Sequence, residues 1–166
     1  FNAVKPHRAF FGQKDAQQVV VIRQMVHDLN IPVDIQVCPI VREADGVALS
    51  SRNVYLSDEE RQSARVLNQA LLEVGEAYDN GERDPDTLRT IAIEKIKAQP
   101  NVELDYVSLA TATTFEEVIT SLDVPLLLSV AARVGKPRLL DNCLLPLVLN
   151  NRQDATSTLG ASSSDA

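Results

Sequence analysis

The architecture of this chain is set by residues 8–37, which read RAFFGQKDAQQVVVIRQMVHDLNIPVDIQV. Residues 8–12 are a short apolar run that ends in glycine and predicts a strand, and the alternation over 33–37 predicts a second strand. Between them the spacing predicts a helix over about 15–29, because apolar side chains recur every three or four positions. The expected buried stripe of this helix consists of Val19, Ile22, Val26 and Leu29.

A strand, a helix and a strand within about 30 residues are typical of a βαβ unit with parallel strands. A parallel sheet is normally covered on both faces, and two strands alone do not make a stable sheet. We therefore expect either that the rest of this chain completes the sheet or that further strands precede Phe1.

Two further helices are predicted in the middle of the chain. The first begins at a capping box, in which the Glu60 amide donates to the Ser57 hydroxyl and the Glu60 carboxylate reaches back to Ser57. This helix is expected to run to about residue 80. Asp84 and Pro85 open the second helix, as its N-cap and its first helical residue.

The last third of the chain predicts mostly strands. Alternating residues at 102–109 and the apolar stretches at 125–133 and 138–145 are expected to form three of them, and 114–119 is expected to form one short helix. Residues 150–166 are rich in Ser, Thr, Asn and Asp, and they offer too little apolar surface to offset the entropy of ordering. We expect this tail to be disordered.

The composition excludes several classes of protein. A hydrophobic content of 45% indicates a chain that can bury a core, and a net charge of −7 weighs against general nucleic-acid binding. No apolar run approaches the roughly 18 residues of a membrane span, and the chain opens without a secretion leader, so we expect a cytoplasmic protein. Cys38 and Cys143 lie far apart in sequence and are expected to be small buried hydrophobic residues rather than a disulfide.

One candidate binding segment lies at the turn between the first strand and the helix. Gly12 permits close backbone approach, and the amides that follow it are unpaired at a helix N-terminus, where phosphate binds well. Lys14 adds a cation, Asp15 is either an N-cap or a ligand partner, and Gln18 lies one turn further along the same face. The alternative is a plain capped helix with solvated side chains.

A second candidate segment is VREADGVALSSRN, at residues 41–53. It shows no regular period, and Asp45-Gly46 predicts a turn within it. Hydroxyls followed by a guanidinium suit a polyphosphate, which Arg binds as a fork. The carboxyl ends of neighbouring parallel strands converge on one crevice, so both segments are expected there; a solvated linker is the alternative. The residues concerned are Ser50, Ser51 and Arg52.

Other polar residues give weaker signals. His7 and His27 are 20 positions apart without a carboxylate pattern, and we expect both to be structural. No cluster of His and Cys is present, so a metal site held by the protein is not expected. Residues 138–142 combine Arg, Asp and Asn and could form a charged pair near the crevice, although a structural role is favoured.

Three stretches in register resemble the pantoate–β-alanine ligase family. They are FFGQKDAQQ at 10–18, VREADGVALSSRN at 41–53 followed by YLS at 55–57, and AARVGKPRLLDN at 131–142. The likeness extends from Phe1 to about Leu145. This family is similar to class I aminoacyl-tRNA synthetases in its nucleotide-binding fold.

The resemblance implies ATP-dependent synthesis of pantothenate, part of coenzyme A biosynthesis, in two steps. ATP adenylates the carboxylate of pantoate and pyrophosphate leaves with Mg²⁺; the amine of β-alanine then displaces AMP. It further implies a homodimer in the full-length enzyme, with Gln18 as the pantoate-binding residue and catalysis by charge cancellation at Lys14, Ser50, Ser51 and Arg52. The expected contacts with ATP come from Gly12, Gln13, Lys14, Asp15, Val41, Leu49, Ser50, Ser51 and Arg52.

Two departures from the family pattern qualify this expectation. Gln13 stands where most relatives are expected to have Glu, and the nucleotide-binding half with its HxGH motif is absent. The predicted fold is α/β, with a partial Rossmann-like parallel unit at 1–40, a hinge loop and small α+β domain at 41–149, and the tail at 150–166. The rival functions are another adenylyl-forming transferase and a non-catalytic truncated chain.

Overall fold

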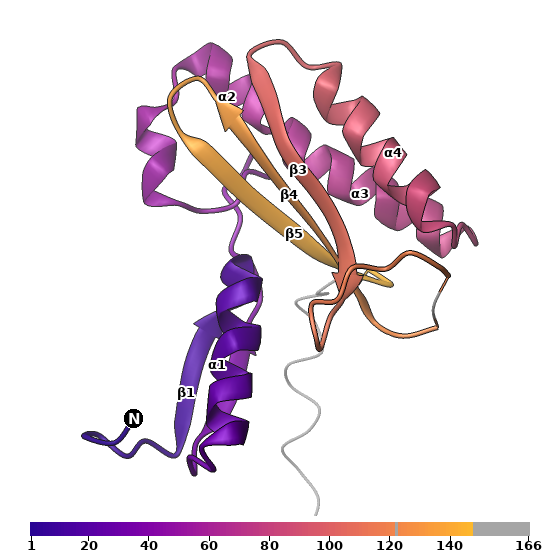
Figure 1. Cartoon of the computed structure of the whole chain (residues 1–166). Helices are drawn as coiled ribbons and strands as arrows, with labels where there is room; N and C mark the ends of the chain where they lie inside the picture. Colours follow the sequence, from indigo (N-terminus) through magenta and orange to yellow (C-terminus); the bar gives the residue numbers. More distant parts are fainter. Residues whose placement is uncertain (122, 148–166) are drawn as a thin grey trace, which may run out of the picture.

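The computed structural model describes residues 1–121 and 123–147 and has a mixed α/β fold with two separate sheets. The first sheet is parallel and contains β1 (Arg8–Gly12) and β2 (Asp34–Cys38). The second sheet is antiparallel and has the order β3-β4-β5. Figure 1 shows that β1 and α1 extend away from the second sheet as an arm, with the N-terminus at the far end of that arm.

The arm is the predicted βαβ unit. Strands β1 and β2 pair in parallel from Arg8 opposite Asp34 to Gly12 opposite Cys38, and α1 (Ala16–Asp28) connects them. A short 3-10 turn, η1 (Gln13–Asp15), lies between β1 and α1. Within residues 1–121 and 123–147 this sheet has two strands, so the described part of the chain does not complete it.

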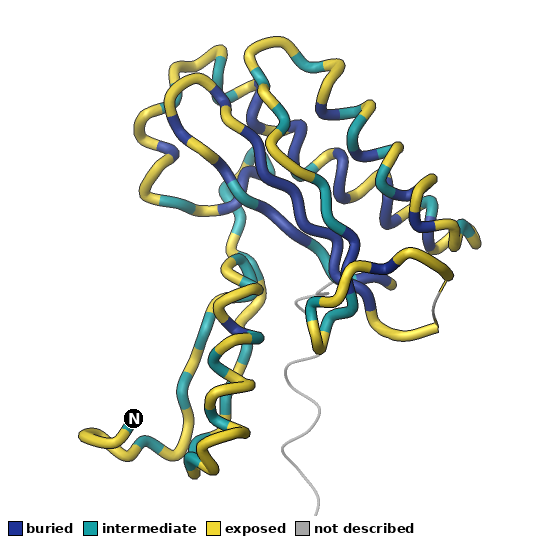
Figure 2. Tube along the Cα trace, viewed as in Figure 1, coloured by how far each residue is buried: buried dark blue, intermediate teal, exposed yellow. Residues whose placement is uncertain are grey.

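The predicted buried stripe of α1 is largely wrong. Val19 is buried, but Ile22 and Val26 are only half-buried and Leu29 is 66% exposed. The physical reason is that two strands offer the helix a narrow surface, as the exposed residues along the arm in Figure 2 show. Cys38 is also exposed, against expectation, and Cys143 is half-buried; both thiols are free.

The second sheet forms one layer and two helices form the other. It contains β3 (Val102–Thr111), β4 (Leu126–Val134) and β5 (Arg138–Leu145), the three predicted strands. Helices α3 (Val66–Asp79) and α4 (Pro85–Lys97) cover one face of the sheet (Figure 1). The largest fully buried side chains lie between these layers and include Leu71, Leu88, Ile96, Leu109, Leu128 and Leu145.

The helix expected from residue 57 to 80 is divided at Arg65 into α2 (Asp58–Ala64) and α3. The predicted capping box is confirmed: the Glu60 amide donates to Ser57 Oγ over 3.2 Å, and Glu60 Oε2 accepts from the Ser57 amide over 2.9 Å. The predicted Asp84 cap of α4 is also confirmed, because Asp84 Oδ2 accepts from the Thr87 amide over 2.8 Å.

The short helix predicted over 114–119 is wrong. The chain instead turns back against the end of β3, where the Val118 amide donates to the Leu109 carbonyl and the Thr111 amide donates to the Glu116 carbonyl, each over 2.9 Å. This pairing buries Val118 and gives hydrogen-bond partners to backbone groups at the edge of β3, which a helix over 114–119 would leave unpaired. The expected disordered tail at 150–166 lies outside the described residues.

None of the helices among the described residues is long and apolar enough to cross a membrane.

Candidate functional site

The candidate site begins at the turn between β1 and α1. Gly12 ends the strand in an extended conformation, and the 3-10 turn that follows leads the chain into the first turn of α1. Asp15 occupies the N-cap position, but its carboxylate makes no capping hydrogen bond and is exposed. The turn therefore leaves both an anionic side chain and helix N-terminal amides available to a ligand.

The loop after β2 is ordered by a small hairpin. Arg42 and Ala48 form an isolated antiparallel bridge, and the Gly46 amide donates to the Glu43 carbonyl over 2.9 Å, which confirms the predicted Asp45-Gly46 turn. Gly46 has φ +91°, and a Cβ atom there would lie 2.7 Å from Asn68 Nδ2. The positive φ favours glycine at this position, and a Cβ atom there would also require the Asn68 side chain to move.

Arg61 of α2 fixes the hairpin to the helical layer. Its guanidinium donates to Glu43 Oε2 over 2.7 Å and, through Nε, to Asp45 Oδ2 over 2.7 Å. These hydrogen bonds hold the pKa of Glu43 and of Asp45 below their usual range. The loop is thus held at its turn, before it reaches the predicted phosphate-binding residues.

The Ser-Ser-Arg segment forms a second 3-10 turn, η2 (Ser51–Tyr55). Ser50 caps it, because Ser50 Oγ accepts from the Arg52 amide over 3.3 Å. Ser51 and the Arg52 side chain are exposed. Asn53 is buried and donates to the Ala48 carbonyl over 3.1 Å, so it connects this turn to the end of the preceding hairpin.

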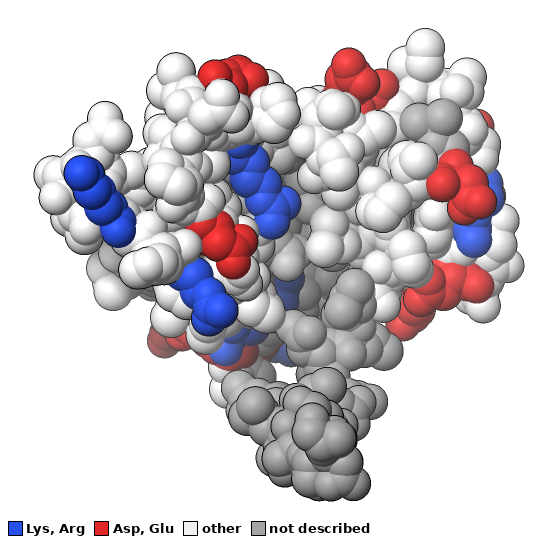
Figure 3. All heavy atoms as spheres, turned by 90° about the horizontal axis from the view of Figure 1, so that it is seen from below, with Lys and Arg blue, Asp and Glu red and all other residues white. Residues whose placement is uncertain are grey.

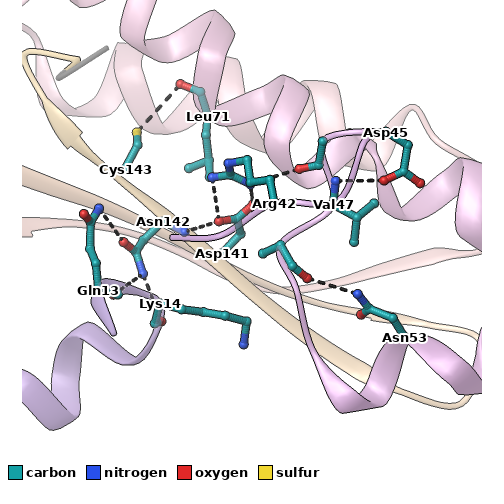
Figure 4. A network of polar contacts seen from close by, with 12 residues as sticks. Gln13, Lys14, Arg42, Asp45, Val47, Asn53, Leu71, Asp141, Asn142 and Cys143 are labelled. Atoms are coloured by element: carbon teal, nitrogen blue, oxygen red, sulfur yellow. Dashed lines mark hydrogen bonds and ion pairs between the residues drawn. The ribbon is translucent and has the colours of Figure 1, made fainter. Parts of the chain in front are cut away.

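Residues from the two predicted segments line one pocket. Lys14 from the first segment and Ser50 and Arg52 from the second line this small pocket, beside Asp141 of β5. Figure 4 shows the Lys14 side chain extending from its turn toward the segment that carries Asn53. Convergence of these residues is what the parallel unit predicts, since both segments follow the carboxyl ends of β1 and β2.

The other predicted residues lie around this pocket. Gln18 lines a neighbouring groove of about 490 Å³ together with Lys14 and Asp15. This volume is within the usual range for small-molecule sites. Val41 and Leu49 present apolar side chains that are 64% and 55% exposed. The Gln13 side chain does not line either of these pockets. It lines a separate pocket beside Asn142 and Cys143, and its Nε2 donates to Asn142 Oδ1 over 3.3 Å.

Sequence reasoning underrated Asp141, Asn142 and Arg42. Asp141 is 3% exposed, and Arg42 donates to both of its carboxylate oxygens, over 2.6 and 3.0 Å. Burial raises the pKa of Asp141, and the Arg42 guanidinium opposes that effect. One signal was available in the sequence, because Asp-Asn interrupts an otherwise apolar strand, and buried polar residues require partners.

The charge distribution on the face shown in Figure 3 is mixed, with Lys and Arg side chains and Asp and Glu side chains interspersed among uncharged residues. A surface of mixed charge is compatible with a small anion bound in a pocket.

The comparisons with known proteins decide the family. The family model for pantoate-beta-alanine ligase matches residues 1–144. The chain belongs to the pantoate–β-alanine ligase family. It is 50% identical over 145 residues to a pantothenate synthetase of Acetivibrio thermocellus, covering 87% of this chain and 51% of that protein. A Roseiflexus pantothenate synthetase is 53% identical, over 87% of this chain and 52% of its own length.

Solved structures of this ligase family agree with the fold. The pantothenate synthetase of Thermus thermophilus superimposes with a TM-score of 0.79 at 41% identity, covering 86% of this chain and 51% of that one. A pantoate-beta-alanine ligase of Francisella tularensis, in complex with beta-gamma ATP and β-alanine, gives a TM-score of 0.55 at 27% identity over 86% of this chain and 45% of that one. The chain thus spans about half the length of the relatives it matches.

Proposed function

We propose that this chain serves in the ATP-dependent ligation of pantoate and β-alanine to pantothenate, through a pantoyl-adenylate intermediate. The observation that carries the proposal is that Lys14, Ser50 and Arg52 line the same small pocket. A flexible ammonium, a hydroxyl and a forked guanidinium from two separate segments form a suitable set of partners for a polyphosphate.

In this proposal the pocket residues act by cancelling charge. Lys14, Ser50, Ser51 and Arg52 stabilise the negative charge that builds on the α-phosphate and on the departing pyrophosphate. Gly12, Gln13, Asp15, Val41 and Leu49 contact the rest of ATP, through backbone or apolar surface. Gln18 binds pantoate, because it lines the groove next to Lys14 and carries both a donor and an acceptor.

Mg²⁺ fits this site as a companion of the nucleotide. The described residues include no group of three or more His, Cys, Asp or Glu side chains that could hold a metal ion. Asp15 is an exposed carboxylate within the Gln13–Asp15 turn and is the residue suited to support such an ion. The metal supplies charge neutralisation on the phosphates, and the chain supplies their position.

In the whole enzyme, the two-stranded sheet of the arm is proposed to belong to a larger nucleotide-binding domain. The arm presents exposed apolar side chains, with Phe10 66% and Val21 62% exposed. Residues 1–40 are therefore proposed to be one part of a parallel sheet, with 41–149 as hinge loop and second domain and 150–166 as tail. The whole enzyme is proposed to be a cytoplasmic homodimer.

The decisive experiment extends this chain to the length of the relatives that it matches. The chain is fused behind the preceding half of the Acetivibrio thermocellus enzyme, and pyrophosphate release is measured with ATP and pantoate. Release that depends on pantoate, followed by pantothenate formation on adding β-alanine, supports the proposal. Release with other hydroxy acids but not with pantoate favours a different adenylyl transferase, and no release favours a non-catalytic chain.

A further inference from the structure

Two consecutive residues of β5 hold the two halves of the candidate site. Side chains alternate between the faces of a strand, so Asp141 and Asn142 point in opposite directions. Asp141 bonds Arg42 in the loop after β2, whereas Asn142 bonds the turn after β1 (Figure 4). Neither residue has an assigned role in the proposed function.

Asn142 uses its whole amide group on the turn. Its Nδ2 donates to the Gln13 carbonyl over 3.1 Å and to the Lys14 carbonyl over 3.0 Å, and its Oδ1 accepts from Gln13 Nε2 over 3.3 Å. The side chain is buried, with 4% of the residue exposed. A buried amide with both donors and its acceptor satisfied has one preferred orientation, so it fixes the groups that it contacts.

This contact is the polar connection between the arm and the rest of the fold. Within the described residues, every hydrogen bond between residues 1–38 and residues 39–147 involves Asn142. No ion pair of the described residues crosses between the same two parts. The position of Lys14 relative to Ser50 and Arg52 therefore depends on Asn142.

We propose that Asn142 is a positioning residue, which holds the Gln13–Asp15 turn so that Lys14 and the helix amides face the Ser50–Arg52 turn. Asn142 also borders the groove that contains Gln18, but its two donors and its acceptor are all engaged by the turn. Its two donors restrain the carbonyls of Gln13 and Lys14, which directs the amides of the following residues away from β5 and toward the pocket. The effect on nucleotide binding rests on the proposed function, whereas the restraint on the turn does not.

The test compares Asn142→Asp and Asn142→Ala with Cys143→Ala in the 166-residue chain. Asn142→Asp keeps the size but replaces the donors with a carboxylate facing two carbonyls; Asn142→Ala serves if the buried charge prevents folding. Cys143 is a matched control, because it follows on the same strand and points to the other face, toward the Leu71 carbonyl. Hydrogen exchange of the amides of Val19 to Ile22, the first that bond within α1 and therefore the first that report how firmly the turn is held, is measured together with the dissociation constant for Mg²⁺-ATP.

We expect exchange at these amides to be about tenfold faster in the Asn142 variants than in Cys143→Ala, and ATP binding to be about tenfold weaker, as for the loss of one or two hydrogen bonds. Exchange equal to that of the control overturns the proposal. If the original chain itself fails to bind ATP, the proposed function fails for the isolated chain, and the exchange result alone still decides the role of Asn142.

Discussion

Arg42 and Asp141 stand 99 positions apart in the sequence and form a two-pronged ion pair, with Nη1 2.6 Å from Oδ2 and Nη2 3.0 Å from Oδ1. The same Nη1 donates to the Gly46 carbonyl over 3.1 Å. The pair therefore connects the middle of β5 to the hairpin that precedes the Ser50–Arg52 turn. Asp141 is buried and Arg42 is partly buried, so each depends on the other for compensation.

Breaking this pair on one side is expected to destabilise the fold strongly. Arg42→Leu leaves the Asp141 carboxylate buried without its partner, and the free energy of unfolding in urea is expected to fall by about 3 kcal/mol. The double variant Arg42→Leu/Asp141→Leu is expected to recover most of that loss. Arg138→Leu, which breaks a more exposed pair with Asp105, is the control and should cost about 0–1 kcal/mol. A loss in Arg42→Leu no larger than in this control would contradict the account.

The Arg61 cluster predicts a pH dependence of stability. Since the pKa values of Glu43 and Asp45 are lower in the folded chain than in the unfolded chain, both carboxylates add stability above about pH 4 and lose that contribution as the pH falls further. Arg61→Gln removes the cause of the shift. The free energy of unfolding of the original chain should therefore decline more steeply on acidification than that of Arg61→Gln, and parallel curves would refute this explanation.

Gly46 is predicted to tolerate substitution less well than Gly81. Both have positive φ, at +91° and +105°, but a Cβ atom at Gly46 meets Asn68, whereas nothing lies within 4 Å at Gly81. Gly81→Ala measures the backbone strain alone, about 1 kcal/mol. Gly46→Ala should cost more than this in thermal unfolding, and equal costs would show that Asn68 moves aside freely.

Gln18 is predicted to discriminate between the two substrates of the adenylation step. In the fusion with the preceding half of the relative, Gln18→Ala should raise the KM for pantoate about tenfold or more, because one or two hydrogen bonds are lost, and leave the KM for ATP nearly unchanged. Gln24→Ala, at an exposed position further along α1, is the control. Equal losses for both substrates would indicate a damaged turn instead of a lost pantoate contact.

The local elements of this fold were predictable because their signals are local. The alternation at 33–37 and the capping box at Ser57 each depend on residues a few positions apart, and both are present in the structure. The helix predicted over 114–119 is wrong because pairing with the edge of β3 outweighs a weak helical pattern. The exposure of Leu29 could not be read from periodicity, since periodicity gives the apolar face of a helix but not the width of the sheet beneath it.

Part of the candidate site was also predictable, from the order of the predicted strands. Lys14, Ser50 and Arg52 follow the carboxyl ends of two parallel strands, and this topology places both segments at the same edge of the sheet. The partners of Asp141 and Asn142 lie 99 and 128–129 positions away in the sequence, beyond the reach of any local pattern. Only the polar interruption of an apolar strand marked these two residues.

The central claim is that Lys14 and Arg52 form one phosphate clamp, and pyrophosphate release in the presence of ATP and pantoate tests it most directly. In the fusion protein, Lys14→Ala and Arg52→Ala should each lower the rate about a hundredfold, as for the loss of one charge-stabilising contact in a transition state. Arg52→Lys should recover only part of the rate, because an ammonium lacks the forked geometry, and Arg133→Ala, at an exposed arginine of β4, should have little effect. Near-normal release by a folded Arg52→Ala protein would contradict the claim and leave the Ser50–Arg52 turn as a solvated linker.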